Sequence, residues 1–150
     1  MNRRFAFNIV FALLLGFLLP SCEVSDNGDL DGFWYLTRLD SIQTGTTVDM
    51  HNRQLSWSFQ MDLMQTFDGS QDLWDTITMF RFEHTGKQLI ISEPFIYDRL
   101  NGDKLLTPDR YWEIRHYGIN SVPDIFTVDK LNRKHLNVHD DVLRLYFEKR

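Results

Sequence analysis

Two histidines near the C-terminus have a spacing that could serve metal chemistry. His135 and His139 are four residues apart, and on a helix this spacing would place two imidazoles on one face as zinc ligands. However, Leu136 and Val138 alternate with polar residues here, which is typical of a strand. Four residues of strand extend about 13 Å, which is too far for two ligands of one ion. We therefore expect two solvent-facing histidines and no metal site.

The carboxylate pairs and the single cysteine are the other residues that could do chemistry. Asp72 with Asp75, and Asp140 with Asp141, could offer oxygens to calcium, but such a site needs several oxygens that converge. Both pairs lie in polar, turn-like sequence, which favours a solvated surface. The sequence contains no Gly-x-Ser-x-Gly motif and no phosphate-binding loop. Cys22 is the only cysteine, and lipid attachment would remove its thiol as a catalytic nucleophile. Because no catalytic set of residues is then found, the sequence predicts a protein that is not an enzyme and has no cofactor.

The surroundings of Cys22 indicate a lipid attachment site. Two arginines precede an apolar run of 15 residues, 5–19, which is shorter than the roughly 18 residues of a membrane-spanning helix. A basic start followed by a short apolar core is the order of a secretory signal. The end of the run, Leu19-Pro20-Ser21-Cys22, resembles the bacterial lipobox, in which the signal is cut before the cysteine and the cysteine is lipidated. We expect residues 1–21 to be a lipoprotein signal peptide that is removed. The alternative is an ordinary secretory signal that happens to contain a cysteine.

This resemblance implies a lipoprotein of the cell envelope, anchored to the outer membrane on its periplasmic face or at the cell surface. Residues 22–30 are polar and acidic, which predicts a flexible tether similar to the acidic export sequence of Bacteroidota lipoproteins. Without residues 1–21 the chain has 14 Lys and Arg against 21 Asp and Glu, a net charge of −7. That acidity argues against nucleic acid as a partner and against direct adhesion to anionic lipid.

The residues after the signal have the composition and patterning of β-structure. They contain no alanine, the best helix former, and are rich in aromatic residues and threonine. Residues 55–63 alternate strictly between apolar and polar side chains, which predicts a strand with one buried face. Further strands, separated by turn-forming residues, are expected over 33–39, 76–84, 88–92, 95–99, 125–131, 135–139 and 142–148. Short strands joined by short turns predict an antiparallel meander, either a sandwich or a barrel.

One segment departs from the strand pattern. Thr107 can cap a helix, Pro108 suits its first turn, and Gly118 can end it. These signals predict a short helix over residues 110–117. The alternative is a strand through residues 111–114.

The first expected strand carries a motif with a known structural role. Gly32-Phe33-Trp34 resembles the Gly-x-Trp motif of lipocalins and the wider calycins. In that family the Trp closes the bottom of an up-and-down barrel, and a basic residue from a late strand packs across it, which we transfer to Arg144. The ladder Leu-Asn…Leu-x-Val…Leu-x-Phe near the C-terminus is similar to small lipocalin-like lipoproteins of Bacteroidota. The resemblance covers residues 31–150 and implies a mostly β fold, an antiparallel barrel of about eight strands with one short helix.

The large apolar side chains allow two hypotheses, because an eight-stranded barrel can be packed with side chains or hold one small ligand. In the first, which the lipocalin resemblance implies, the domain binds a small apolar or amphipathic molecule. In the second, the interior is filled, and a non-catalytic envelope protein binds a protein or glycan on its outer surface, through the loop 44–54 or the excursion 93–123. The candidates for the barrel interior or for lining a ligand are Trp34, Leu36, Leu55, Trp57, Phe59, Met61, Phe80, Phe82, Phe126 and Phe147.

Overall fold

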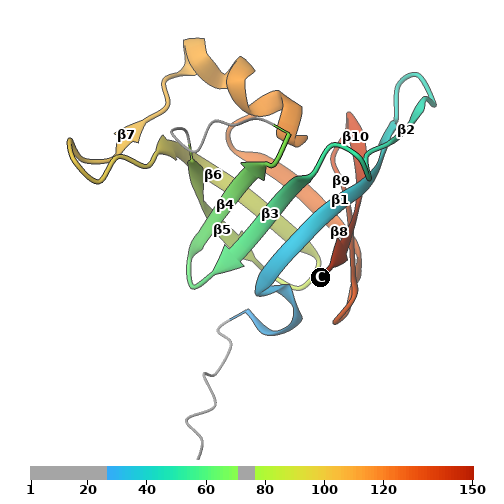
Figure 1. Ribbon diagram of the computed structural model, residues 1–150. Coiled ribbons are helices and arrows are strands. Elements are labelled where there is room, and N and C mark those ends of the chain that lie inside the picture. The colour runs from blue at the N-terminus through green and yellow to red at the C-terminus, as the bar shows by residue number, and fades with distance from the viewer. Residues whose placement is uncertain (1–26, 71–76) are drawn as a thin grey trace, which may run out of the picture.

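The chain folds into a closed antiparallel β-barrel, which confirms the predicted fold class. The computed structural model describes residues 27–70 and 77–150. Eight longer strands in this part of the chain follow one another around the barrel, and the last pairs with the first to close it (Figure 1). These are β1 (Gly32–Ser41), β3 (Leu55–Gln60), β4 (Leu63–Asp68), β5 (Thr78–His84), β6 (Gln88–Ile96), β8 (Asp124–Leu131), β9 (His135–His139) and β10 (Leu143–Lys149).

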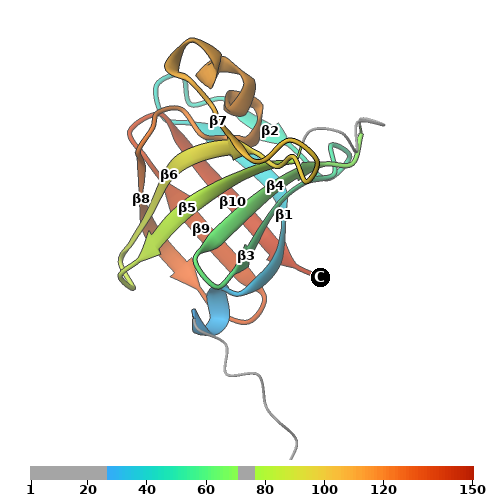
Figure 2. The same ribbon diagram turned by 90° about the vertical axis from the view of Figure 1, so that its left-hand side faces the viewer.

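Four short elements decorate this barrel. Strand β2 (Thr47–Asp49) pairs with β1, and β7 (Lys104–Leu105) pairs with β6. The 3-10 helices η1 (Gly28–Leu30) and η2 (Pro108–Tyr117) lie at opposite ends of the barrel, as both views show (Figures 1 and 2). We refer to them as the η1 end and the η2 end. Within the described residues, no helix is long and apolar enough to cross a bilayer.

The strand predicted over residues 55–63 is in fact two strands, β3 and β4, joined by a tight turn at Met61 and Asp62. Gln60 and Leu63 pair directly across this turn, and Met61 has a φ of 56°. The side chain of Met61 is 65% exposed, so its predicted place in the barrel interior is wrong. Beyond the turn the buried face moves to even positions, beginning with Met64. The sequence conceals the turn because a methionine, rather than glycine, occupies the positive-φ position.

The expected strand 88–92 and the first two residues of the expected strand 95–99 form one strand, β6, which bends at Glu93 and ends at Ile96, so the prediction of strand over residues 97–99 is wrong. Glu93 has a φ of 48°, and the register with β5 shifts between Met79 and Arg81. An irregularity of this kind bends a strand without ending it, which explains why the sequence pattern breaks while the strand continues.

The helix expected over residues 110–117 is present as η2. Its end is as predicted, since Gly118 adopts the left-handed conformation and its N–H donates to the carbonyl of Arg115 over 2.9 Å. Its start differs in one detail. Thr107 has an extended backbone but makes no capping hydrogen bond with its side chain.

The η1 end shows where the ordered domain begins. Leu30 is buried in the core, and the side chain of Asn27 donates to Asp31 over 2.6 Å and to the carbonyl of Met61 over 2.8 Å. We expected a flexible tether over residues 22–30 and a barrel domain over 31–150. This boundary is too late, because residues 27–30 belong to the folded domain. Cys22 and residues 1–21 lie outside the described residues.

The interior of the barrel is packed by aromatic rings. Trp57 lies between Phe147 and Phe126, with ring centroids 4.6 and 5.6 Å apart, and Phe59 lies 6.3 Å away. These are the separations at which aromatic pairs attract each other. All four rings are at most 1% exposed. Within the described residues, the buried core runs from Leu30 to Phe147.

Candidate functional site

The η1 end is closed by Trp34 and Lys149. The indole of Trp34 is fully buried and donates to the carbonyl of Leu30 over 2.6 Å. The Nζ of Lys149 lies 4.6 Å from the centroid of the Trp34 ring and donates to the carbonyl of Asp29 over 2.8 Å. This ammonium group is placed for a cation–π interaction. Trp34 and Lys149 thus join β1, β10 and η1 at this end of the barrel.

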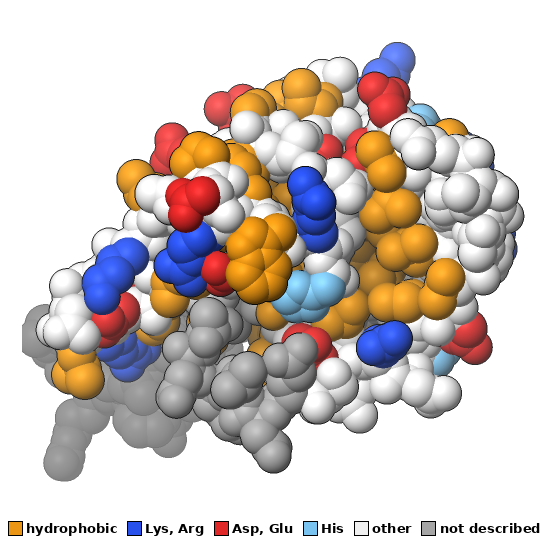
Figure 3. Space-filling view, turned by 90° about the horizontal axis from the view of Figure 1, so that it is seen from above, with side chains coloured by type: hydrophobic (Ala, Val, Ile, Leu, Met, Phe, Trp, Pro, Cys, Tyr) orange, Lys and Arg blue, Asp and Glu red, His pale blue; other side chains and the backbone are white. Residues whose placement is uncertain are grey.

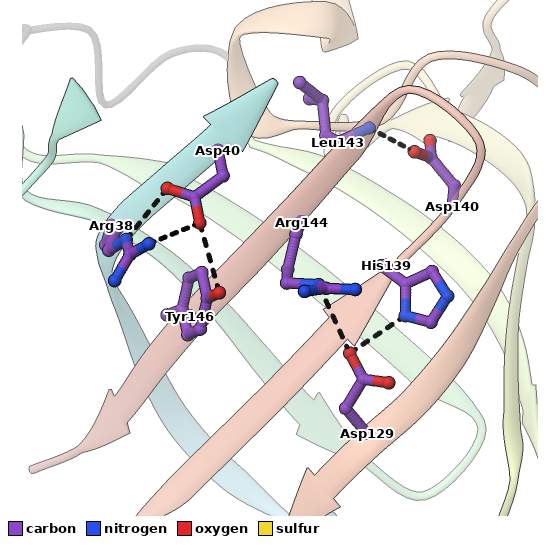
Figure 4. Close-up of polar contacts among 8 residues, drawn as sticks. All are labelled: Arg38, Asp40, Asp129, His139, Asp140, Leu143, Arg144 and Tyr146. Atoms are coloured by element: carbon purple, nitrogen blue, oxygen red, sulfur yellow. Dashed lines mark hydrogen bonds and ion pairs between the residues drawn. The ribbon is translucent and has the colours of Figure 1, made fainter. Parts of the chain in front are cut away.

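Lys149, and not the predicted Arg144, is the basic partner of Trp34. Arg144 points outward from β10, where its Nε lies 3.6 Å from Asp129 (Figure 4). The alternation of residues along β10 distinguishes Lys149 from Arg144 in the sequence. Lys149 has the same parity as the inward-facing Leu145 and Phe147 on β10, whereas Arg144 has the opposite parity.

The η2 end is covered by the excursion between β6 and β8. Its apolar side chains Leu106, Ile114 and Ile119 are buried in the barrel core. Tyr117, the last residue of η2, is buried as well, and we call it the Tyr117 plug. Its carbonyl accepts a hydrogen bond from the indole N–H of Trp57 over 3.0 Å. The plug is thus hydrogen-bonded to an aromatic side chain that is buried in the barrel core.

The hydroxyl of Tyr117 also has a polar partner inside the barrel. It shares a side-chain hydrogen bond with Thr66, whose hydroxyl donates to the carbonyl of Thr78 over 3.3 Å. Burial raises the pKa of the Tyr117 hydroxyl, so this group is uncharged at neutral pH. A buried hydroxyl with hydrogen-bond partners carries little cost, which explains how a tyrosine can occupy the mouth of the barrel.

A cavity of about 270 Å³ lies beside the plug, and we call it the rim pocket. It is bounded by the segment before β3, by the start of β3, by the end of β4 and by η2. Figure 3, which looks down on this end, shows hydrophobic side chains gathered among charged ones. The residues that line the rim pocket are Met50, Arg53, Leu55, Asp68, Ser70 and His116.

The floor of the rim pocket is apolar and its walls are polar. Met50 and Leu55 form the floor, since both are buried in the core. Asp68 lies opposite Leu55 in the register of β3 and β4, and its Oδ1 accepts from the backbone N–H and hydroxyl of Ser70 over 2.9 and 2.6 Å. An apolar surface beside oriented polar groups is the usual construction of a small-molecule site.

The two basic side chains of the rim pocket differ in charge. Burial lowers the pKa of His116, although nearby Asp68 acts in the opposite direction. The imidazole is therefore neutral at pH 7, and its ring centroid lies 3.7 Å from that of Tyr117. Arg53 carries a guanidinium group with five N–H donors, and no carboxylate among residues 27–70 and 77–150 forms an ion pair with it.

A second cavity, of about 280 Å³, lies on the other side of the segment before β3. Leu55 borders both cavities, and Gln54, with a φ of 53°, stands between them. This segment therefore forms a partition at the edge of the barrel mouth. The second cavity is lined by Tyr35, Leu36, Thr37, His51, Gln54, Leu55, Phe67 and Arg150.

A larger hollow of about 530 Å³ on the outer wall is lined in part by Asp124, Asp140 and Asp141. Asp124 accepts from the backbone N–H of Asn120 over 2.7 Å. Asp140 accepts from the backbone N–H of Leu143 over 2.5 Å (Figure 4). These two carboxylates thus hold loops in place. In the described part of the chain, no group of three or more His, Cys, Asp or Glu could hold a metal ion.

The histidines and aspartates that the sequence analysis considered as metal ligands are distributed around the barrel wall. His139 lies 2.9 Å from Asp129, and His135 lies on the same face of β9 at its other end. Asp72 and Asp75 lie outside the described residues. Of the described candidates, His139 lines the same outer hollow as Asp140 and Asp141, whereas His135 does not line it.

A charged cluster also occupies the outer face of β1 and β10. Asp40 accepts from Arg38 over 2.8 and 2.6 Å and from the hydroxyl of Tyr146 over 3.1 Å (Figure 4). Thr47 adds a further hydrogen bond of 2.8 Å. The hydrogen bond from Arg38 is the main reason why the pKa of Asp40 falls to about 2.

The candidate interior residues other than Met61 are all buried in one core. Of these, Leu55 also lines the rim pocket. Sequence reasoning missed the rest of that pocket, because its residues come from a loop, a strand end and a helix end without any periodic pattern. The nine buried residues are Trp34, Leu36, Leu55, Trp57, Phe59, Phe80, Phe82, Phe126 and Phe147.

Comparisons with known proteins agree with this architecture. A family model described as a lipocalin-like domain matches residues 15–150. A lipocalin-like protein from Bacteroides uniformis superposes with a TM-score of 0.59 at 21% identity, over 82% of this chain and 100% of that chain. An uncharacterized protein from Bacteroides eggerthii gives 0.54 at 12% identity, over 81% and 99%. A protein from Burkholderia xenovorans gives 0.51 at 14% identity, over 81% and 83%. No curated protein matches the chain.

Proposed function

Because this chain belongs to the lipocalin-like domain family, we propose that it binds a small amphipathic ligand in the rim pocket. We further propose that it is a lipoprotein of the cell envelope, held to the outer membrane by lipid on Cys22, and that it has no catalytic activity. The lipocalin-like fold supports ligand binding in general. The rim pocket supports this particular location.

The observation that carries the proposal is an open cavity with an apolar floor and polar walls at one end of the barrel. Its volume of about 270 Å³ corresponds to about nine groups of the size of a water molecule, at roughly 30 Å³ each. Typical ligand pockets begin at about 300 Å³. A compact molecule with a short apolar part and a polar end fits these dimensions.

The packing of the interior limits how deep such a ligand can go. Trp57 fills the centre of the barrel, and its indole N–H is already bonded to the Tyr117 plug. Entry to the centre would break this buried hydrogen bond, which is costly. The ligand therefore lies above the plug, against Met50 and Leu55.

The experiment that tests this proposal fills the pocket from a single position. We use the chain from residue 22 onward with Cys22→Ser, which retains the buried core from Leu30 to Phe147, and 1-octanol as the probe. His116→Trp places a large ring in the rim pocket, whereas Arg115→Trp adds the same ring at the neighbouring position, which does not line the pocket. Calorimetry should show saturable binding that His116→Trp abolishes and Arg115→Trp retains. Absence of binding to the unsubstituted chain, or equal loss in both variants, would show the proposal to be wrong.

A second function is favoured by exposed apolar side chains on the excursion. Trp112 on η2 is 66% exposed, Leu105 on β7 is 69% exposed, and Leu100 is 93% exposed. Exposed apolar residues of this size can mark a contact surface, here for a protein or glycan of the envelope. A photo-crosslinking amino acid at position 112 in living cells should then give one defined adduct, while the same group at exposed Val48 should not. Equal labelling from both positions would argue against this function.

A further inference from the structure

We infer that the ligand of the rim pocket carries an anionic group, and that Arg53 recognises it. This inference rests on the proposed function, because it names the class of ligand that the same pocket takes. It follows from which polar groups of the pocket already have partners and which do not.

Among the described residues, the side chain of Arg53 has no ion-pair partner. Its backbone N–H donates to the carbonyl of Met50 over 2.9 Å, which fixes where the side chain begins. Its guanidinium forms no ion pair with the carboxylates of residues 27–70 and 77–150. In this part of the chain Arg38, Arg81, Arg110 and Arg144 form ion pairs, and Arg53 is the arginine without one that lines the rim pocket.

The other two polar groups do not call for a cationic ligand. The carboxylate of Asp68 already accepts two hydrogen bonds from Ser70. His116 stacks near Tyr117 and offers a neutral ring that can donate or accept one hydrogen bond. Among the described residues of the pocket, the Asp68 carboxylate thus has hydrogen-bond donors of its own, whereas the guanidinium of Arg53 has no carboxylate acceptor.

The shape of the guanidinium group and the apolar floor together indicate which class of ligand the pocket would take. A guanidinium binds carboxylate and phosphate through two parallel hydrogen bonds. Met50 and Leu55 provide a buried surface beside it, suited to a short hydrocarbon chain. The ligand class is thus a small anionic amphipath of about nine groups, such as a short-chain carboxylate or an alkyl phosphate.

The test compares three probes with the same chain and different head groups. Octanoate, 1-octanol and octylammonium are titrated into the chain from residue 22 with Cys22→Ser. We expect octanoate to bind about tenfold more tightly than 1-octanol, because a hydrogen bond to a charged group contributes at least that much. Octylammonium should bind more weakly than either. Octyl phosphate, titrated in parallel, distinguishes a phosphate from a carboxylate ligand.

Two substitutions assign the preference to one residue. Arg53→Gln should bring octanoate and 1-octanol to equal affinity, whereas Arg115→Gln, which removes an arginine of η2 outside the pocket, should leave the tenfold ratio intact. Arg53→Lys keeps the positive charge and should keep the rejection of octylammonium, which guards against a folding defect in the first variant.

The outcomes separate this inference from the proposed function. If all three octyl probes bind equally well and Arg53→Gln changes nothing, the pocket binds ligands but the inference is wrong. If no octyl probe binds, both the inference and the proposed function are wrong. If the preference for octanoate survives in Arg53→Gln, recognition by Arg53 is wrong even though the ligand is anionic.

Discussion

The indole N–H of Trp57 donates to the carbonyl of Tyr117 over 3.0 Å, across 60 residues of sequence. This one hydrogen bond joins β3, in the middle of the barrel wall, to the last residue of η2. It explains why the excursion lies over the mouth of the barrel instead of extending into solvent. It also explains why the cavity at this end is shallow.

Replacing Trp57 by Phe should loosen the η2 end. The substitution removes the donor, leaves the buried carbonyl of Tyr117 without its partner, and shrinks the ring at the centre of the core. We expect the free energy of unfolding in urea to fall by about 2 kcal/mol. Amide hydrogens of residues 114–119 should exchange faster. The matched change Trp112→Phe, on an exposed ring, should stay within about 0.5 kcal/mol, and equal effects of the two changes would contradict this assignment.

Lys149→Met should destabilise the η1 end. Methionine keeps most of the apolar stem but loses the ammonium group that lies over Trp34 and the hydrogen bond to Asp29. We expect a loss of about 1 kcal/mol. Arg144→Met serves as the control, because a surface ion pair contributes about 0.5 kcal/mol or less. A larger loss from Arg144→Met than from Lys149→Met would restore Arg144 as the partner of Trp34.

Asp40 should give the protein a pH-dependent contribution to stability. Its pKa in the folded state, about 2, lies below the ordinary value of 3.8. Its contribution is therefore complete above pH 4 and is lost as the pH falls toward 2. Asp40→Asn should be less stable than the unsubstituted chain at pH 6, and the difference should shrink below pH 4 and approach zero as the pH falls through 2, as measured by thermal unfolding. A difference that stays constant between pH 6 and pH 2 would exclude this ion pair as its source.

Cys22→Ser should release the protein from the membrane. Without the thiol no lipid can be attached, and the remaining domain carries a net negative charge that gives it no affinity for anionic lipid. Fractionation of cells should move the protein from the membrane pellet to the soluble fraction. Ser25→Thr, which lies outside the lipobox and leaves Cys22 in place, is the control. A Cys22→Ser variant that stays in the membrane fraction would refute lipid anchoring at this residue.

The sequence was sufficient to predict strands where alternation is strict and turns are visible, while the choice of a barrel came from the lipocalin resemblance. Strand β9 has the expected bounds, 135–139, because its apolar residues are buried and alternate with polar residues on the outer face. Strand β3 begins as expected at Leu55, but its end at Gln60 was not visible. A two-residue turn without glycine or asparagine leaves the pattern of apolar residues unbroken, and so the predicted position of Met61 was wrong.

The rim pocket could not be predicted for a different physical reason. Met50, Ser70 and His116 are far apart in sequence and lie in segments with no period. Closure of the barrel, together with the return of the excursion over its mouth, brings them together. By contrast, Lys149 could have been found, because its parity on β10 matches that of Phe147. The local sequence pattern determines which face of a strand a residue lies on. The closure of the barrel determines which distant residues it contacts.

The most direct test of the central claim is an NMR titration of the chain from residue 22, carrying Cys22→Ser, with octanoate. We predict saturable shifts of the backbone amides of Arg53, Leu55 and His116, while the indole N–H of Trp57 stays at its starting position because the ligand lies above the plug. The amides of Ile125 and Thr127, on the outer wall, should not move. A large shift of the Trp57 indole would place the ligand in the barrel centre, and shifts confined to the outer wall would place it outside. Either result would contradict a shallow site at the rim.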